Sequence, residues 1–148
     1  MAALPIHAGI LARGSVYHMN KYIRVPYVDG GRTMDGLDCW GLALLVRQDM
    51  GLPDLPADPL AIRGNGKAIA DQFRSISSGL EVSEPKNGAL AAVFKGSLFV
   101  HVGVVIEADG RLWVMETNPG YGVCVRRVAD FNSSYYKVIY YCDKDLSE

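Results

Sequence analysis

The sequence predicts an α+β protein in which N-terminal helices pack on an antiparallel sheet of about five strands. Helical periodicity lies in the first half of the chain. After Asn87-Gly88 the sequence becomes a series of short β-branched and aromatic runs separated by turn residues. A third observation, the absence of internal repeats and of a linker rich in Pro, Gly or Ser, favours one domain over residues 1–148.

The clearest helix is expected from Cys39 to Met50. Its apolar residues recur at the spacing of one buried stripe: Leu42, Leu45, Val46 and Met50. Asp38 is placed to cap the start of this helix, whereas Gly51 and Pro53 are placed to end it. Two further helices are expected, one over residues 67–76 and a short one in the run YHMNKYIRV near the front of the chain.

Five strands are expected in the second half of the chain. They correspond to the runs ALAAVF, SLFVHVGVVI, RLWVMET, GVCVRRV and YYKVIYYC. Turn residues separate these runs, for example Lys95-Gly96-Ser97, Ala108-Asp109-Gly110 and Asn118-Pro119-Gly120. The strands are therefore expected to form an antiparallel meander.

Composition excludes several classes of function. The formal net charge is −1, so the chain has no strongly basic character that would indicate binding to nucleic acid or to an anionic membrane. No apolar run approaches the roughly 20 residues that a membrane-spanning helix needs. Because the first residues lack the features of a secretory signal, the protein is expected to be made in the cytoplasm.

The cysteines and histidines are too far apart in the sequence to indicate a set of disulfides or a metal site. The three cysteines are far apart in the chain: Cys39, Cys124 and Cys142. An odd number of cysteines without an export signal argues against a set of disulfides. Without a Cys-x-x-Cys pair, and with the three histidines dispersed, no metal site is expected. Cys124 and Cys142 are interpreted as strand residues.

Cys39 is a candidate nucleophile because it falls on the first turn of the expected helix. The unpaired N–H groups and the positive end of the helix dipole favour a thiolate there. The same N–H groups can stabilise an oxyanion after attack on a carbonyl. The alternative is that Cys39 is a small buried hydrophobic residue.

His101 is the candidate base, because it interrupts an otherwise apolar strand. A thiol nucleophile needs a base and a third group that orients the imidazole. The alternative is a core histidine whose ring is satisfied by a backbone group. Gly103 lies on the same face of the strand and is expected to leave room for a substrate or for another chain.

Glu116 and Asn118 are the candidates for the orienting residue. If residues 107–110 form the hairpin turn, Glu116 lies opposite His101, and Asn118 follows on the same face. Glu116 is the first choice, but a small error in the turn would transfer the role to Asn118. The alternative for Glu116 is a solvated carboxylate at the end of a strand.

Two other features receive structural interpretations. Arg126-Arg127 is interpreted as a solvated strand end, with contact to an acidic peptide as the alternative. The tyrosine-rich run SSYYKVIYYC is interpreted as a strand that packs in the core, with an aromatic subsite for a glycan as the alternative.

Two blocks of sequence resemble the NlpC-type cell-wall peptidases, a family of papain-like thiol hydrolases. The nucleophile block YIRVPYVDGGRTMDGLDCWGL meets that family's pattern at these positions: Tyr27, Gly30-Gly31, Gly36, Asp38, Cys39 and Gly41. The second block, HVGVVIEADGRLWVMET, is similar to the family's His-Val-Gly strand, turn and return strand. NGALAAVF resembles the strand before it, although Ala89 stands where the family usually has Asp. The matches cover roughly residues 16–55 and 86–142.

The resemblance implies a papain-like NlpC-type fold with Cys39 as nucleophile, His101 as general base and acid, and Glu116 as the orienting residue. Tyr27 would lie beside the nucleophile, and Asp38 would cap the helix or meet a substrate amine. Trp40 replaces the family's common Ser after the cysteine, and Glu116 stands where the family often has His. No metal or organic cofactor is implied.

The resemblance also implies a function. Family members cut amide bonds of peptidoglycan stem peptides next to D-amino acids, such as the γ-D-glutamyl linkage. DCWGL with YIRVPYVDGG upstream looks most like the subgroup found in phage and prophage tail-tip proteins. This subgroup implies tail-tip partners and action on the bacterial wall from a virion. The alternatives are a structural tail protein in which Trp40 narrows the cleft, and an acyl- or amide-transferring relative.

Overall fold

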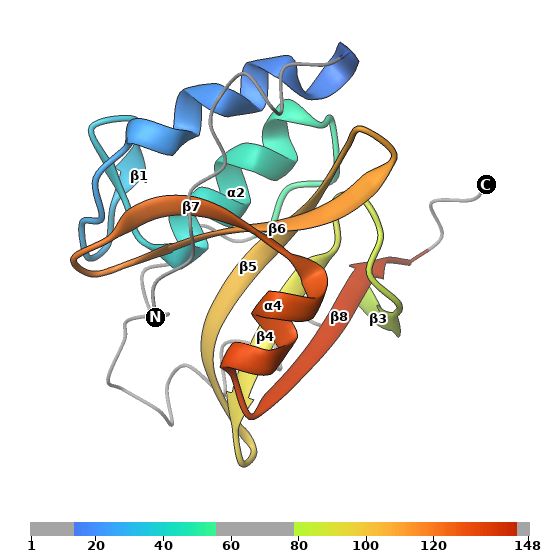
Figure 1. The fold of residues 1–148 in the computed structure, drawn as a ribbon. Helices are drawn as coiled ribbons and strands as arrows, with labels where there is room; N and C mark the ends of the chain where they lie inside the picture. Colours follow the sequence, from blue (N-terminus) through green and yellow to red (C-terminus); the bar gives the residue numbers. More distant parts are fainter. Residues whose placement is uncertain (1–13, 56–78, 145–148) are drawn as a thin grey trace.

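A six-stranded antiparallel sheet forms the centre of the fold. The structure is a computed structural model, and it describes residues 14–55 and 79–144, except for the side chains of residues 14–18. The strand order is β3-β8-β4-β5-β6-β7 (Figure 1). The strands are β3 (Leu80–Ser83), β4 (Leu90–Lys95), β5 (Leu98–Ala108), β6 (Arg111–Asn118), β7 (Gly122–Arg127) and β8 (Lys137–Asp143). The prediction of an α+β class with an antiparallel sheet is confirmed.

The five predicted strands are β4 to β8, and the structure adds β3. This strand of four residues is an edge strand that pairs only with β8, and Glu81 and Val82 are exposed. A short, exposed edge strand buries too little to show an alternating apolar pattern. The sheet therefore has six strands, where about five were expected.

The predicted meander is right for β4 to β7 and wrong for the last strand. β8 pairs with β4, on the opposite side of that strand from β5. The seven-residue helix α4 (Val128–Ser134), which the sequence did not predict, lies between β7 and β8 in the chain. Phe131 is the buried residue of α4, and a helix this short shows no apolar stripe.

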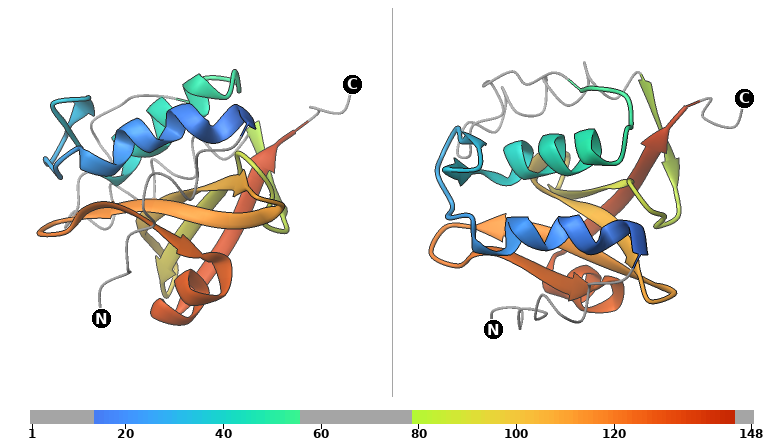
Figure 2. Two further views of the ribbon diagram at one scale, coloured as in Figure 1. Left: turned by 45° about the horizontal axis from the view of Figure 1, so that its top comes forward. Right: turned by 90° about the horizontal axis from the view of Figure 1, so that it is seen from above.

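Helices cover both faces of the sheet. The 3₁₀ helix η1 (Gly14–Arg24) and the helix α2 (Cys39–Asp49) lie on one face, and α4 lies on the other (Figure 2). The strong helix was predicted from Cys39 to Met50, and Met50 is the C-cap of α2. The short helix expected in YHMNKYIRV is part of η1, whereas the helix expected over residues 67–76 lies outside the described residues.

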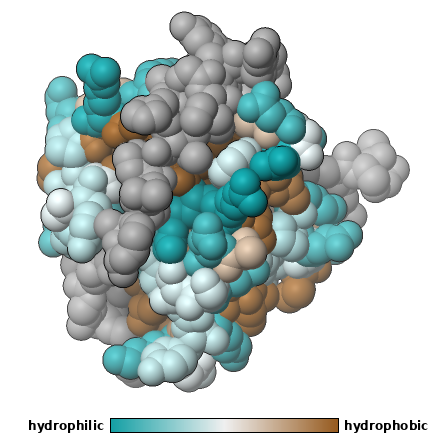
Figure 3. Space-filling model, viewed as in Figure 1, coloured by the Kyte–Doolittle hydropathy of each residue, from teal (hydrophilic) through white to brown (hydrophobic). Residues whose placement is uncertain are grey.

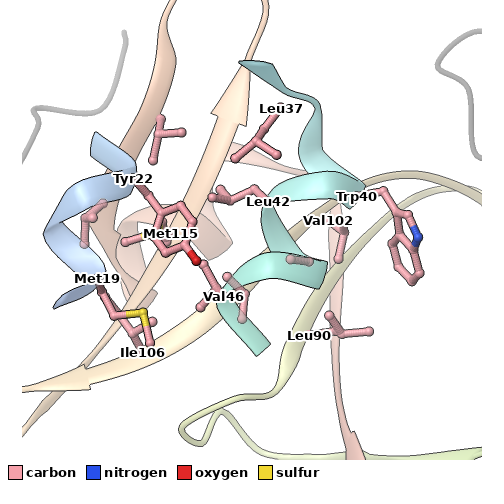
Figure 4. Packing of buried hydrophobic residues seen from close by; sticks show 14 of the residues in the cluster. Met19, Tyr22, Leu37, Trp40, Leu42, Val46, Leu90, Val102, Ile106 and Met115 are labelled. Atoms are coloured by element: carbon pink, nitrogen blue, oxygen red, sulfur yellow. The ribbon is translucent and has the colours of Figure 1, made fainter. Parts of the chain in front are cut away.

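The core has two clusters of buried side chains, one on each face of the sheet, because successive strand residues point to opposite faces. The larger cluster lies under η1 and α2 and includes Met19, Tyr22, Leu42, Val46, Val102 and Met115 (Figure 4). The smaller cluster lies under α4 and includes Val105, Val114, Phe131 and Tyr140. The outer side of α4 is exposed and polar, and hydrophilic surface occupies the middle of this face of the molecule (Figure 3).

A buried ion pair fixes the C-terminal end of α2. Arg47 is 2% exposed, and its Nη1 and Nη2 donate to the two carboxylate oxygens of Asp143 in β8 at 3.0 and 2.6 Å. The same nitrogens donate to the carbonyl oxygens of Gly88 at 2.9 Å and Pro53 at 3.0 Å. One side chain thus connects α2 to β8 and to the loops on either side, and so sets where the helix lies on the sheet.

Within residues 14–55 and 79–144, none of the helices has both the length and the apolar character needed to cross a bilayer. In the same residues no three His, Cys, Asp or Glu side chains are grouped as a metal site would require.

Candidate active site

Cys39 is the first residue of α2 and is partly exposed. The turn before it belongs to the small hairpin of β1 (Arg32–Thr33) and β2 (Gly36–Leu37). Position 41, two residues after Cys39, requires a glycine, because a Cβ there would lie 2.1 Å from the carbonyl oxygen of Gly31. The hairpin and the helix thus pack backbone against backbone, and this contact sets the position of the thiol.

Asp38 is the N-cap of α2, as predicted. Its Oδ1 accepts hydrogen bonds from the backbone N–H of Gly41 at 2.8 Å and from Arg32 Nη1 at 2.7 Å. Its Oδ2 accepts from the backbone N–H of Gly30 at 2.9 Å. The carboxylate is buried and both of its oxygens are bonded within the protein, so the structure favours the cap over contact with a substrate amine.

Replacing Asp38 by alanine is expected to lower the free energy of unfolding by about 1–2 kcal/mol. The change removes the cap and leaves the guanidinium of Arg32 without this partner. Urea unfolding followed by circular dichroism measures the loss. Asp35→Ala, at an exposed position in the same hairpin, should change the free energy by less than about 0.5 kcal/mol. Equal losses in the two variants would contradict the capping role.

His101 lies in β5, is 3% exposed, and hydrogen-bonds to two of the predicted site residues. Its Nε2 lies 2.8 Å from Glu116 Oε1, and a second hydrogen bond joins the imidazole to the Cys39 side chain. Aromatic rings of Phe131 and Tyr135 cover the imidazole, with centroid distances of 6.4 and 5.4 Å. The structure therefore brings Cys39, His101 and Glu116 into one connected group.

Two opposing effects set the protonation of His101. Burial by itself lowers the pKa of the imidazole, because it penalises the charged form. The hydrogen bonds to Cys39 and Glu116, together with the negative charge of both partners, outweigh burial and raise the pKa of His101 from 6.5 to about 9. At neutral pH the ring is thus protonated, with the Glu116 carboxylate as its anionic partner.

The strand register differs from the predicted one by two residues. Ala108 pairs with Arg111, so the turn is Asp109-Gly110, with φ of 56° and 74° as a two-residue hairpin turn requires. Continuing this register places Asn118 rather than Glu116 opposite His101. A two-residue shift keeps both residues on the same face of the sheet, however, and the diagonal neighbour is still within reach of a long side chain.

Glu116 contacts His101 and also receives hydrogen bonds from three other side chains. Its Oε1 accepts from Asn118 Nδ2 at 3.1 Å and from the hydroxyl of Tyr135 at 2.7 Å, and its Oε2 accepts from Arg126 at 3.3 Å. Burial raises the pKa of Glu116, but its bond to His101, the donated bond from Tyr135 and the charge of Arg126 lower it overall. Glu116 therefore stays ionised. Asn118, the alternative candidate for the orienting residue, donates a hydrogen bond to Glu116.

The sequence interpretation missed the roles of Tyr135 and Arg126. Arg126 was read as part of a solvated strand end, but its side chain is mostly buried against Glu116. The signal available was the two-residue period of β7, which puts Arg126 on the face shared with Cys124 and Glu116. No local pattern marks Tyr135, which approaches Glu116 from the end of an unpredicted helix.

The space beside Gly103 is filled rather than open. A Cβ at this position would lie 2.5 Å from a methyl group of Val114 and 3.4 Å from the Phe131 ring. The expectation that Gly103 leaves room for a substrate or for another chain is therefore wrong. The close approach of the Val114 side chain from the neighbouring strand β6 is what requires the glycine.

Trp40 and Tyr27, the two aromatic residues predicted near the nucleophile, differ in burial: Trp40 lies in the core, and Tyr27 lines an open pocket. Trp40 is buried in the same cluster as Val102 and Leu90 (Figure 4), so its ring fills the core and does not line a cleft beside Cys39. Tyr27 forms a bridge with Leu37, two residues before Cys39, and its hydroxyl donates to Asp29 at 2.8 Å. It also lines an open pocket of about 360 Å³ formed by residues 23–27 and 120–122.

The other cysteines have different environments. Cys124 lies in β7 and Cys142 in β8, as expected. Burial, with the nearby charge of Glu116, raises the pKa of the Cys124 thiol to about 11. Cys124 therefore stays a neutral thiol at physiological pH, and Cys39 is the cysteine placed on a helix tip beside an imidazolium.

The fold and the site define an α+β protein with a Cys–His–Glu group whose cysteine begins a helix. No family model matches the sequence, and no curated protein matches it. The structure is similar to the crystal structure of the NlpC/p60 domain of the peptidoglycan hydrolase SagA, with a TM-score of 0.53 and 21% sequence identity. The similarity covers 90% of this chain and 98% of that domain, so the chain has the NlpC/p60 fold.

Proposed function

We propose that this protein is a cysteine hydrolase that cleaves amide bonds, with Cys39 as nucleophile, His101 as general acid and base, and Glu116 as the orienting residue. The observation that carries the proposal is the pair of hydrogen bonds made by His101, one to Cys39 and one to Glu116. A sulfur, an imidazole and a carboxylate in this order meet the requirements for thiol catalysis.

The mechanism follows from the contacts of His101. The Cys39 thiolate attacks the carbonyl carbon, and N–H groups at the start of α2 stabilise the oxyanion of the tetrahedral intermediate. The His101 imidazolium gives its proton to the amine as the C–N bond breaks, leaving a thioester on Cys39. The neutral imidazole then takes a proton from water, whose oxygen attacks the thioester, and the carboxylate product leaves as the thiolate re-forms. Glu116 stabilises the imidazolium throughout.

The proposed substrate is the stem peptide of peptidoglycan, cut at a D-glutamyl or similar D-amino-acid linkage. Two observations support it: the fold shared with a peptidoglycan hydrolase domain, and the resemblance of both sequence blocks to the NlpC-type peptidases. Tyr27 and the pocket that it lines are proposed to hold part of the peptide. Asp38 and Trp40 act as supports in this proposal, one by capping α2 and the other by packing beneath it.

A phage or prophage tail is the proposed setting for this activity. The motif DCWGL with YIRVPYVDGG upstream supports it through its resemblance to tail-tip proteins. In this proposal tail proteins are the partners, and the virion brings the enzyme to the bacterial wall.

Digestion of purified peptidoglycan tests the function. The untreated protein is expected to release soluble peptides whose masses identify the bond cut, and protein alkylated at Cys39 with iodoacetamide should release none. Peptide mapping of the alkylated sample should find the label on Cys39 and not on Cys124, whose raised pKa keeps it neutral.

The outcomes also separate the alternatives. An intact wall together with slow alkylation of Cys39 would indicate a structural tail component and overturn the hydrolase. An intact wall with fast alkylation of Cys39 would indicate a transferase that needs an acyl donor. Release of peptides that is unaffected by alkylation would rule out Cys39 as the nucleophile.

A further inference from the structure

The Glu116 carboxylate is enclosed by side chains that come from three elements. His101 belongs to β5, Arg126 to β7, and Tyr135 follows α4 directly. Glu116 is 2% exposed, so protein groups take the place of water around its two oxygens. A buried glutamate has several rotatable bonds, so it keeps one orientation only if hydrogen-bond donors hold its carboxylate there.

Tyr135 has the geometry to fix that orientation. Its hydroxyl donates to Glu116 Oε1 at 2.7 Å, the same oxygen that meets His101 Nε2 at 2.8 Å. Its ring also lies against the imidazole, and Phe131 packs on it with a centroid distance of 4.9 Å. A tyrosine has few rotatable bonds, so a ring held between two others places its O–H with little freedom.

Arg126 supports Glu116 from the other side. It donates to Glu116 Oε2 at 3.3 Å and, through its other terminal nitrogen, to the Ser134 hydroxyl at 2.5 Å. Ser134 in turn donates to the backbone carbonyl of Asp130 at 2.9 Å, within α4. The short helix α4 therefore anchors both groups that hold the carboxylate.

We propose that Tyr135 is a positioning residue for the reaction, which orients the Glu116 carboxylate toward His101, and that Arg126 assists it from the opposite oxygen. This inference rests on the proposed function, because it describes how the third member of the Cys39–His101–Glu116 group is held. It also gives α4, which covers the smaller core cluster, a second role behind the imidazole.

The pH dependence of the site provides a readout. The titratable groups that face Glu116 are His101 from β5, Cys124 and Arg126 from β7, and Tyr135, while Cys39 lies beyond the imidazole. Burial and the Glu116 charge raise the pKa of Tyr135, and Cys124 is also held neutral, so neither ionises near neutral pH. Because the Tyr135 bond lowers the pKa of Glu116, removing it should let Glu116 take up a proton at higher pH.

The test is the rate of Cys39 alkylation by iodoacetamide against pH, measured by peptide mapping in the full-length protein. Tyr135→Phe keeps the ring and removes the hydroxyl. We expect the acidic limb of the profile to move to higher pH by at least about half a unit. In this variant Glu116 takes up its proton at a higher pH, and the neutral carboxyl no longer stabilises the thiolate–imidazolium pair. Release of peptides from peptidoglycan should fall about tenfold, the effect of one lost hydrogen bond to a charged group.

Tyr140→Phe is the matched control. Its hydroxyl also bonds to the α4 region, to Asn132 at 2.5 Å, but it does not contact Glu116. A purely structural effect of losing a tyrosine hydroxyl should appear equally in both variants, whereas only Tyr135→Phe should move the acidic limb. Arg126→Met is the second variant and is expected to shift the limb in the same direction.

Failure of this inference can be distinguished from failure of the proposed function. A fast-alkylating Cys39 whose acidic limb is the same in the wild type, Tyr135→Phe and Arg126→Met would overturn the positioning role and leave the hydrolase intact. A slow Cys39 in the wild type would overturn the proposed function, and the inference with it.

Discussion

Cys39→Ala is expected to release peptides from purified peptidoglycan at less than about one thousandth of the wild-type rate. Alanine offers no nucleophile, and what is left of the site can only orient a water molecule. The fold should be unaffected, because alanine suits the first turn of a helix and the Asp38 cap remains. Mass identification of the fragments measures the rate, and thermal unfolding checks the fold.

Cys142→Ala is the control for this prediction. Cys142 is buried in β8 and pairs with Glu81 across the strand, on the side of β4 away from β5 and the site. Its replacement should cost some stability and leave peptide release at the wild-type rate. Matching digests from the wild type and Cys39→Ala would end the case for a cysteine hydrolase, even though the fold stands.

Arg47→Met is expected to lower the free energy of unfolding by about 3–5 kcal/mol. Methionine can occupy part of the space, but the Asp143 carboxylate, 8% exposed, is left as a buried charge without this partner. The carbonyl groups of Gly88 and Pro53 lose a donor as well. A loss of this size is a large part of the stability of a small domain. Urea unfolding at pH 7 measures it.

Lys21→Met is the matched control for the ion pair. Lys21 lies 3.2 Å from Asp49 but its side chain is 50% exposed, so water screens the pair, and the change should cost less than about 1 kcal/mol. A double variant, Arg47→Met with Asp143→Asn, should cost less than the sum of the single changes, because the second removes the unpaired charge. A loss below about 1 kcal/mol for Arg47→Met would show that the buried pair is dispensable.

The candidate nucleophile and base could be found from the sequence because their signals are local. An aspartate before an apolar helical stripe predicts a cap, and the structure shows Asp38 in that role beside Cys39. His101 stands out because a single polar residue interrupts an apolar strand. The face of the sheet shared by His101, Glu116 and Asn118 was also predictable, since strand periodicity is insensitive to an error of two residues.

The contacts of these residues could not be found in the same way. The turn was placed one residue too early, which shifts the pairing by two residues, so the prediction paired Glu116 directly with His101, whereas the structure brings them together diagonally. Asn118 was considered as a replacement for Glu116, but it donates to the carboxylate. Short elements such as β3 and α4 carry too few buried residues for any pattern, and the roles of Arg126 and Tyr135 were missed with them.

The sequence alone determined the α+β class, the start of α2 at Cys39, and the faces to which the polar side chains of the strands point. These properties depend on residues within a few positions of each other, through capping and periodicity. Only the tertiary structure decided that β8 returns beside β4, that Tyr135 reaches Glu116, and that Arg47 meets Asp143 across 96 residues. Such contacts depend on register and packing over the whole chain, and neither segment of a pair carries that information by itself.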